Sequence, residues 1–415
     1  MNSKKGFLLI VFTFFSLPTQ AQQPIAPLNL QAVVELYMRK NLELQAARFQ
    51  LERTKADEIA ARLRPNPGLT LAAENLPFSG PTPFHRLYEI SASYSETIEL
   101  GGKRKVRERL AELTVSTAEA QFEDVMRHGL ADVKRLYYTA LLARYNVEVA
   151  NDNRQTFEQL VQFNLTRFEE GAIPELDLIK VRLERMKVDS AFRQAELNYR
   201  QAGIRLLEKL GESGFSKPDI QGEFNFRAAD LQLDAFREFA LNERPDVRTA
   251  VRDLAAVRER LTLERTRAKP DVSPFVGYKR IGDDNTVMIG VNVPLKVRDR
   301  NQAAIVRADT DVKAAETRLQ LARSHALAEV EAAYEAFQMT REQIQTFQNE
   351  LLRQADESRT ITLAAYEEGG TELLPVLDAQ RTRSEVQRQY FKTLFDYQAS
   401  IIDLELAVGR EINHE

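Results

Sequence analysis

The 415-residue chain contains no cysteine, no strong excess of charge of one sign and, beyond its N-terminus, no long apolar run. The absence of cysteine excludes disulfide bonds, thiolate metal sites and a lipid attached through an N-terminal cysteine. The 61 acidic and 57 basic residues nearly balance, which argues against a nucleic-acid-binding protein, because such proteins carry a basic patch. With only 17 glycines and 15 prolines, the chain is also not of low complexity.

Residues 1–21 have the pattern of a cleaved secretory signal peptide. Lys4 and Lys5 precede the apolar run 7–17, and the small residue Ala21 ends the segment. A run of 11 apolar residues is short of the roughly 20 that a membrane-spanning helix needs. We therefore predict cleavage after Ala21 and export of the mature chain without a lipid anchor.

A twelve-residue motif occurs twice. Residues 167–178 (RFEEGAIPELDL) return as residues 365–376 (AYEEGGTELLPV), and the central glycines Gly171 and Gly369 are 198 positions apart. A repeat of half the chain indicates two similar structural units. The predicted organisation is listed in order along the chain: signal peptide 1–21, first repeat 22–211, linker 212–232, second repeat 233–411 and tail 412–415.

Most of each repeat has the periodicity of α-helix. One helix is predicted from about residue 30 to 64 and its counterpart from 233 to 269, and each ends at a proline. Two much longer helical stretches cover 103–168 and 301–368, and at 1.5 Å per residue each is about 100 Å long. Helices then return over about 175–210 and 374–408, so each repeat is predicted to contain a long antiparallel helical hairpin.

After each proline stop the periodicity changes from helix to strand. We predict strands at about 68–76 and 86–96 in the first repeat, and at about 271–281 and 285–294 in the second. Strands of about 9–10 residues suit an outer-membrane barrel, although a hairpin lying on a soluble core has the same pattern. Because the smallest membrane barrels have about eight strands, four strands from one chain would have to be pooled with those of other copies.

The repeated motif reads as a turn between two helices. Gly171 and Gly369 can adopt the left-handed conformation that ends a helix, and Pro174 or Pro375 fits the first turn of the next. Acidic residues near the new N-termini complement the helix dipole. These are Glu175, Asp177 and Glu372.

Over residues 28–411 the order of elements resembles the TolC-like outer-membrane efflux proteins. Residues 94–104 (YSETIELGGKR) resemble the family's junction between strand and helix, which is most familiar in the cobalt–zinc–cadmium branch. The junction residues are Gly101, Gly102, Lys103 and Arg104. The stretches Asn66-Pro67 and Val293-Pro294-Leu295 are also family-like.

The resemblance implies a fold that is mainly α with a small β part. It implies a homotrimer whose twelve strands form one barrel in the outer membrane above a periplasmic α-helical barrel. The repeated turns would form the periplasmic tips, dock a periplasmic adaptor and act as a gate, with energy supplied by an inner-membrane resistance-nodulation-division pump. The chain itself would be a passive channel that contacts outer-membrane lipid and needs no cofactor.

The same resemblance nominates gate residues. Family members commonly carry an aspartate six residues after the tip glycine, where this chain has Asp177 in the first copy and Pro375 in the second. Asp378 matches a later aspartate of the second pattern, and Glu372 adds negative charge. Whether these carboxylates face the tunnel or cap their helices stays open from the sequence.

Substrate choice cannot be derived from the residues. The four histidines are scattered, there is no ligand cluster, and metal export is favoured over drug export or type I secretion by the family branch alone. The competing class is a soluble periplasmic coiled-coil scaffold. An enzyme is disfavoured because no nucleophile–base motif, Gly-rich cofactor loop or metal-ligand spacing is present.

Overall fold

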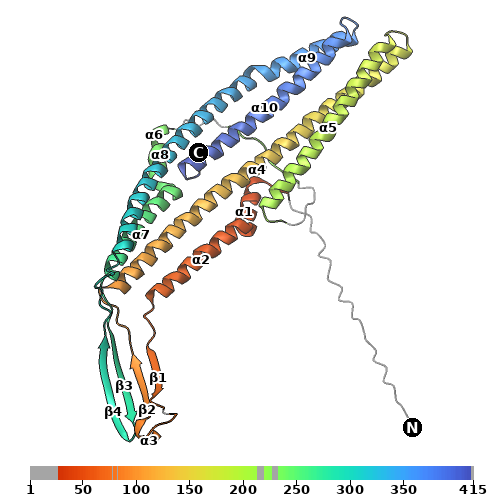
Figure 1. Ribbon diagram of the computed structural model, residues 1–415. Coiled ribbons are helices and arrows are strands. Elements are labelled where there is room, and N and C mark those ends of the chain that lie inside the picture. Colours follow the sequence, from red (N-terminus) through yellow and green to blue (C-terminus); the bar gives the residue numbers. More distant parts are fainter. Residues whose placement is uncertain (1–26, 77, 82, 213–218, 227–231, 413–415) are drawn as a thin grey trace, which may run out of the picture.

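The computed structural model describes residues 27–76, 78–81, 83–212, 219–226 and 232–412 (Figure 1). The predicted signal peptide lies outside the described residues, as do most of the predicted tail and parts of the predicted linker. The described chain forms an elongated helical body with a four-stranded sheet at one end and two helical turns at the other (Figure 1).

Two long helical hairpins make up most of the body. In the first, α4 (Lys103–Glu169, 67 residues) is followed by α5 (Glu175–Lys209). In the second, α8 (Gln302–Thr346), a π-helical turn (Phe347–Leu351) and α9 (Leu352–Glu367) together form one long limb, and α10 (Leu373–Val408) returns along it. The prediction of one α-helix over 301–368 therefore missed the π-helical turn.

The two shorter helices of the sequence prediction are each broken into two. Residues 30–64 form α1 (Leu30–Lys40) and α2 (Leu42–Arg62), and residues 233–269 form α6 (Leu233–Glu243) and α7 (Pro245–Arg267). Asn41 has an extended backbone and caps α2, its Oδ1 accepting the N–H of Leu44 at 2.7 Å. At the second break, Pro245 keeps Arg244 out of the helical region and starts α7 at its first position.

Each break is hydrogen-bonded to the C-terminal end of the returning long helix in its own repeat. Asn41 Nδ2 donates to the carbonyl of Lys209 at 2.7 Å, and Arg244 Nη1 donates to that of Ala407 at 2.9 Å. Gly211 follows the first of these helix ends in the left-handed conformation, and a Cβ there would lie 2.6 Å from the Lys40 carbonyl oxygen. The close approach of the two elements therefore requires glycine.

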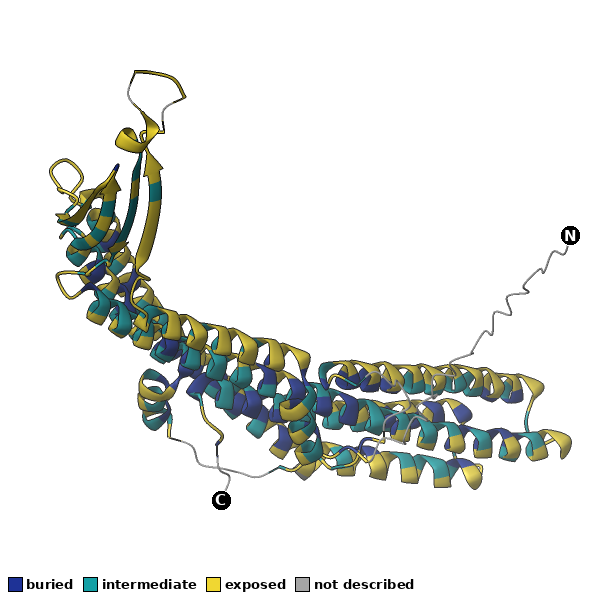
Figure 2. Cartoon of the chain, turned by 90° about the horizontal axis from the view of Figure 1, so that it is seen from below, coloured by how far each residue is buried: buried dark blue, intermediate teal, exposed yellow. Residues whose placement is uncertain are grey.

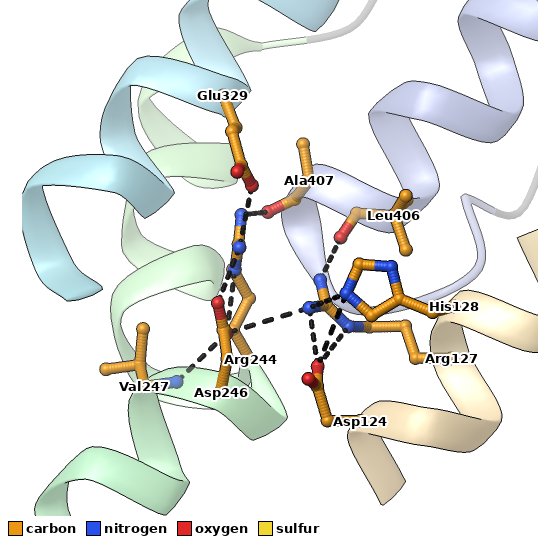
Figure 3. Close-up of polar contacts among 9 residues, drawn as sticks. All are labelled: Asp124, Arg127, His128, Arg244, Asp246, Val247, Glu329, Leu406 and Ala407. Atoms are coloured by element: carbon orange, nitrogen blue, oxygen red, sulfur yellow. Dashed lines mark hydrogen bonds and ion pairs between the residues drawn. The ribbon is translucent and has the colours of Figure 1, made fainter.

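Arg244 lies at the centre of a buried polar cluster (Figure 3). The residue is 2% exposed, and its guanidinium contacts Asp246 Oδ2 at 2.7 Å and Glu329 Oε2 at 2.7 Å. Burial acts to raise the pKa of Asp246, but the hydrogen bond and charge of Arg244, the charge of Arg127 and the Val247 N–H together outweigh it and hold the pKa below its ordinary value. The ion pair between Arg244 and Asp246 contributes fully to stability above the ordinary pKa of aspartate. This contribution is lost as the pH falls through the lowered pKa of Asp246.

A second arginine ties the cluster to the first repeat. Arg127 of α4 donates to Asp124 at 2.6 Å and to the carbonyl of Leu406 in α10, and it lies 3.8 Å from Asp246. The cluster thus joins helices α4, α7, α8 and α10, which come from both halves of the chain.

The sheet is antiparallel with order β1-β2-β3-β4, so each repeat supplies one neighbouring pair of strands. Their bounds are Gly68–Glu74, Glu89–Ser95, Ser273–Ile281 and Asp284–Asn292. The short helix α3 (Phe84–Leu87) occupies the loop between β1 and β2, so the second strand begins three residues after its predicted start. Tyr88 lies outside the strand and stacks on Phe84 with ring centroids 5.3 Å apart.

Apolar side chains are buried along the helices, whereas the strands carry exposed and half-buried residues (Figure 2). One core cluster packs α1 on α4 and α5, and a second packs α6 on α8 and α10. Part of the predicted linker belongs to the first core: Ile220 is fully buried and forms a β-bridge with Leu28. No described helix is both long enough and apolar enough to cross a membrane.

Replacing Arg244 with alanine should destabilise the helical body by about 3–5 kcal/mol, because it leaves Asp246 partly buried without its cation. A fall in the melting temperature of the purified protein would measure this loss. Arg258→Ala removes an exposed ion pair to Glu316 (2.8 Å) and should cost at most about 1 kcal/mol. Equal melting temperatures for the two variants would contradict a structural role for the buried cluster.

Candidate functional site

The two helical turns have the same backbone conformation. Gly171 has φ 73° and Gly369 has φ 77°, both left-handed, and each turn is closed by a short hydrogen bond back to the ending helix. Ala172 N–H donates to Arg167 O at 2.8 Å, and Gly370 N–H donates to Ala365 O at 2.7 Å. No atom lies within 4 Å of a Cβ built on Gly171 or Gly369, so the conformation, and not lack of space, favours glycine.

Carboxylates gather at both turns. Eight lie within nine residues of the two tip glycines: Glu169, Glu170, Glu175, Asp177, Glu367, Glu368, Glu372 and Asp378. Asp177 is half-buried and pairs with Lys180 at 3.0 Å on its own helix. Asp378 is exposed, and no ion pair joins it to another described residue. Glu372 occupies the N-cap position of α10, but its side chain makes no capping hydrogen bond.

A buried contact near the turns connects the two hairpins, and the sequence prediction missed it. Tyr366 is 4% exposed, and its hydroxyl donates to Oδ1 of the fully buried Asn164 in α4. Arg167 donates to the Tyr366 carbonyl at 3.3 Å, and its guanidinium lies 5.3 Å from the Tyr366 ring. Burial raises the pKa of Tyr366 above its ordinary value, although the nearby charge of Arg167 opposes the shift.

The repeat itself holds the signal that could have revealed this contact. The position equivalent to Tyr366 in the first copy is Phe168, which is exposed and has no hydroxyl to donate. A tyrosine in place of phenylalanine in an otherwise similar motif marks the one copy that needs a polar partner. Further from the turns, Arg383 of α10 extends the connection to Asp152 of α4 at 2.7 Å.

The sheet and the helices meet at a second organised region, built around Lys103 at the start of α4. This side chain is 6% exposed, and its Nζ donates to the Lys269 carbonyl and to Asp271 Oδ1, both at 2.7 Å. Gly101 and Gly102 precede it with φ 75°, and a Cβ on Gly101 would meet the Lys269 side chain at 2.7 Å. Of the predicted junction residues, Gly101 and Lys103 thus contact the segment that follows α7.

Arg104 does not join these contacts, since it pairs with Glu108 at 3.3 Å along its own helix. The sequence prediction missed Arg107, which donates to the carbonyls of Ala61 and Leu63 at 2.9 and 3.0 Å and pairs with Glu99 at 2.6 Å. Lys103 and Arg107 therefore donate hydrogen bonds to carbonyls at the ends of α7 and α2, where the chain passes from the helices to the strands.

One face of the sheet is apolar across all four strands. The register aligns Leu69, Tyr94, Val276 and Ile289 in one row and Leu71, Ala92, Tyr278 and Val287 in the next. The large side chains of these rows are exposed, from 46% at Tyr94 to 82% at Ile289. The opposite face carries polar residues, which include Thr70, Ser91, Ser93, Lys279 and Thr286.

No three described His, Cys, Asp or Glu side chains are grouped so that they could hold a metal ion. The features that the described residues do form are the acidic turns, the polar junction and the exposed apolar sheet face.

Comparison with known proteins identifies the class: the chain belongs to the outer membrane efflux protein family, whose profile matches residues 33–212 and 237–410. The cobalt-zinc-cadmium resistance protein CzcC of Cupriavidus metallidurans is 26% identical over 95% of this chain and 93% of that protein. The cation efflux system protein CusC of Escherichia coli K12 is 25% identical over 89% of this chain and 82% of that protein.

Solved structures have the same fold. A crystal structure of CusC covers 92% of this chain and 92% of its own, with a TM-score of 0.77 at 19% identity. The Campylobacter jejuni CmeC outer membrane channel covers 97% and 94%, with a TM-score of 0.78 at 17% identity. The resemblance to TolC-like proteins of the cobalt–zinc–cadmium branch is confirmed. The protein is an outer-membrane efflux protein that extends into the periplasm, and its relatives are channel proteins.

Replacing Tyr366 with phenylalanine should loosen the contact between the hairpins near the turns, because Asn164 Oδ1 is left buried without a donor, at a cost of about 1–3 kcal/mol. Faster amide hydrogen exchange over 160–180 and 360–378 would measure the change. Tyr390→Phe removes an exposed hydrogen bond from Gln348 (3.2 Å) and should leave these amides unchanged. Unchanged exchange in the Tyr366 variant would show that the contact does not restrain the turns.

Proposed function

We propose that the protein is the outer-membrane exit channel of a tripartite efflux pump and passes heavy-metal cations outward without an energy-consuming step of its own. The observation that carries this proposal is the apolar sheet face, which is in register over four strands and exposed. A face of this kind suits contact with lipid hydrocarbon, and the polar opposite face suits a wet lumen. If the protein were a soluble scaffold, this apolar face would be left in contact with water.

The number of strands calls for assembly of several copies, and a trimer is the form that the resemblance to the family implies. One chain supplies four, fewer than the roughly eight of the smallest membrane barrels, whereas three copies would supply twelve. In this assembly, repeat 22–211 and repeat 233–411 each contribute one strand hairpin to the barrel and one helical hairpin to a periplasmic tunnel. The junction of Gly101, Gly102, Lys103 and Arg104 would then lie where barrel and tunnel meet.

The turns at the opposite end are proposed as the periplasmic tips, which bind a periplasmic adaptor coupled to an inner-membrane pump. Asp177 and Asp378 would line the gate, next to Gly171 and Gly369. Glu175 and Glu372 would add to its negative charge. Eight carboxylates at the two turns favour the entry of cations, because charged rings at a constriction tune ion selectivity.

Metal cations are preferred as the substrate for two reasons. The relatives include proteins named for cobalt, zinc and cadmium resistance and for cation efflux, and the tips are acidic. A conducting pore needs weak sites from which the ion can leave, so a tight ligand cluster is not required. Multidrug efflux and type I secretion are the alternatives that the same architecture serves.

Val287→Arg should lower the amount of assembled protein in the outer membrane, because a cation on the lipid-facing side near the bilayer midplane costs about 2–4 kcal/mol. The neighbouring Thr286→Arg places the same charge on the opposite face and should assemble normally. Outer-membrane fractions analysed for detergent-stable trimer would measure both. Normal trimer yield from the Val287 variant would show that this face does not meet lipid.

Asp177→Asn together with Asp378→Asn should reduce cation selectivity in planar bilayers and lower the tolerance of cells to cobalt, zinc and cadmium more than their tolerance to drugs. Glu52→Gln with Glu238→Gln removes the same charge from exposed positions on α2 and α6 and serves as the control. Unchanged selectivity in the aspartate variant would remove these residues from the gate. A loss of drug tolerance alone would favour the multidrug alternative.

A further inference from the structure

The loop between β4 and α8 alternates apolar and cationic side chains. Leu295 and Val297 are 80% and 66% exposed, and they are interleaved with three exposed cations. These are Lys296, Arg298 and Arg300. If this loop bound nothing, polar residues at 295 and 297 would suit its exposed positions. The two large aliphatic side chains found there instead point to a partner with an apolar region.

The loop is held in a defined conformation. Val297 N–H donates to Leu295 O at 3.0 Å, and Asn301 N–H donates to Asp299 Oδ1 at 2.8 Å. Asn301 is left-handed at φ 64°, and its side-chain amide donates to the carbonyl and carboxylate of Glu264 at 2.9 and 2.7 Å. Because the loop is fastened to α7, its cations are held near one place and lose less freedom on binding.

The loop borders a hollow of about 370 Å³ that is lined by five cations and three carboxylates, Asp299 of the loop among them, so positive charge is left over. Three of the cations that line it are already paired: Lys103 with Asp271, Arg107 with Glu99 and Arg267 with Glu264. Lys269 and Lys296 also line the hollow, and no described carboxylate pairs with either of them. The same holds for Arg298 and Arg300 on the loop. We call these four cations, with Leu295 and Val297, the junction patch.

The junction patch lies where the strands end and the helices begin (Figure 1). Lys269 lies two residues after α7 ends at Arg267, and the loop begins after β4 ends at Asn292. With the strands in the hydrocarbon of the outer membrane and the helices in the periplasm, this level coincides with the headgroups of the periplasmic leaflet. Long cationic side chains at such an interface place their charge among phosphates while neighbouring aliphatic side chains enter the acyl region.

We propose that the junction patch binds the phosphate of anionic phospholipid headgroups in the periplasmic leaflet of the outer membrane. The inference rests on the proposed function in one respect, that the sheet crosses the membrane. The spare positive charge of Lys269, Lys296, Arg298 and Arg300 matches the phosphate, and exposed Leu295 and Val297 match the adjoining acyl chains. Bound lipid would fix the depth of the barrel relative to the tunnel.

The test uses the purified full-length protein in a non-ionic detergent, titrated with phosphatidylglycerol or phosphatidylcholine. We expect phosphatidylglycerol to raise the melting temperature and to stay bound in native mass spectrometry. The variant Lys269→Gln, Lys296→Gln, Arg298→Gln, Arg300→Gln should bind it at least about tenfold more weakly, because each cation near an anionic lipid surface contributes to binding. The control is Arg182→Gln, Arg193→Gln, Arg200→Gln, Arg205→Gln, which removes four charges from α5 and should bind lipid as the natural sequence does.

Three results would overturn the inference. Equal lipid affinity in the two quadruple variants would show that the patch is not the lipid site. The same thermal shift with inorganic phosphate alone would point to a free-anion site. Loss of the trimer in the patch variant before lipid is added would show that the patch is a contact between copies of the chain. Channel formation by the patch variant in planar bilayers is read separately, so the inference can fail while the proposed export function stands.

Discussion

One buried polar side chain in each repeat, Asn41 in the first and Arg244 in the second, fixes the path of the short helices, and the rest of the molecule depends on this pair. Asn41 and Arg244 occupy the two helix breaks, and each donates to a carbonyl near the end of its returning helix. A buried donor that lost its acceptor would pay its full desolvation cost, so each break is fixed in position. The fixed breaks direct α2 and α7 toward Lys103 and Arg107, which in turn set where the strands begin.

The two repeats have kept one backbone while their side chains have diverged. The turns at Gly171 and Gly369 have nearly the same φ, yet only the second copy carries the tyrosine that reaches Asn164 in the other hairpin. The breaks show the same divergence, since a neutral amide at Asn41 corresponds to a buried guanidinium at Arg244. Only the guanidinium has donors enough to contact three helices of its own repeat, α7, α8 and α10. Arg127 of α4, which lies 3.8 Å from Asp246, then joins this break to the first repeat.

Features set by local backbone chemistry could be predicted from the sequence. The tip glycines and the strand periodicity specify their own conformations, so the turns and the hairpins were predicted near their observed positions. The break at Asn41 was missed because this residue sits inside helical periodicity and is held by a tertiary contact to Lys209. The break at Arg244 does have a local signal in the sequence, Pro245, which the helical periodicity on both sides outweighed. Arg107, like Asn41, was missed because its contacts are tertiary: its partners are carbonyls 44 and 46 residues away. The gate residues stay a prediction, since in the proposed assembly the contacts that define a gate would lie between chains.

The order of the four strands has a consequence for assembly. With β1 and β4 at the two ends of the sheet, a lone chain has an unpaired backbone edge on each side. Hydrocarbon offers no partner for such edges, so a single subunit gains little by inserting by itself. If the edges pair with one another, the first strand of one copy must meet the last strand of the next, a head-to-tail contact that closes only as a ring. Insertion into the membrane and closure of the ring would then occur together. Association of the helices of different copies could come before both.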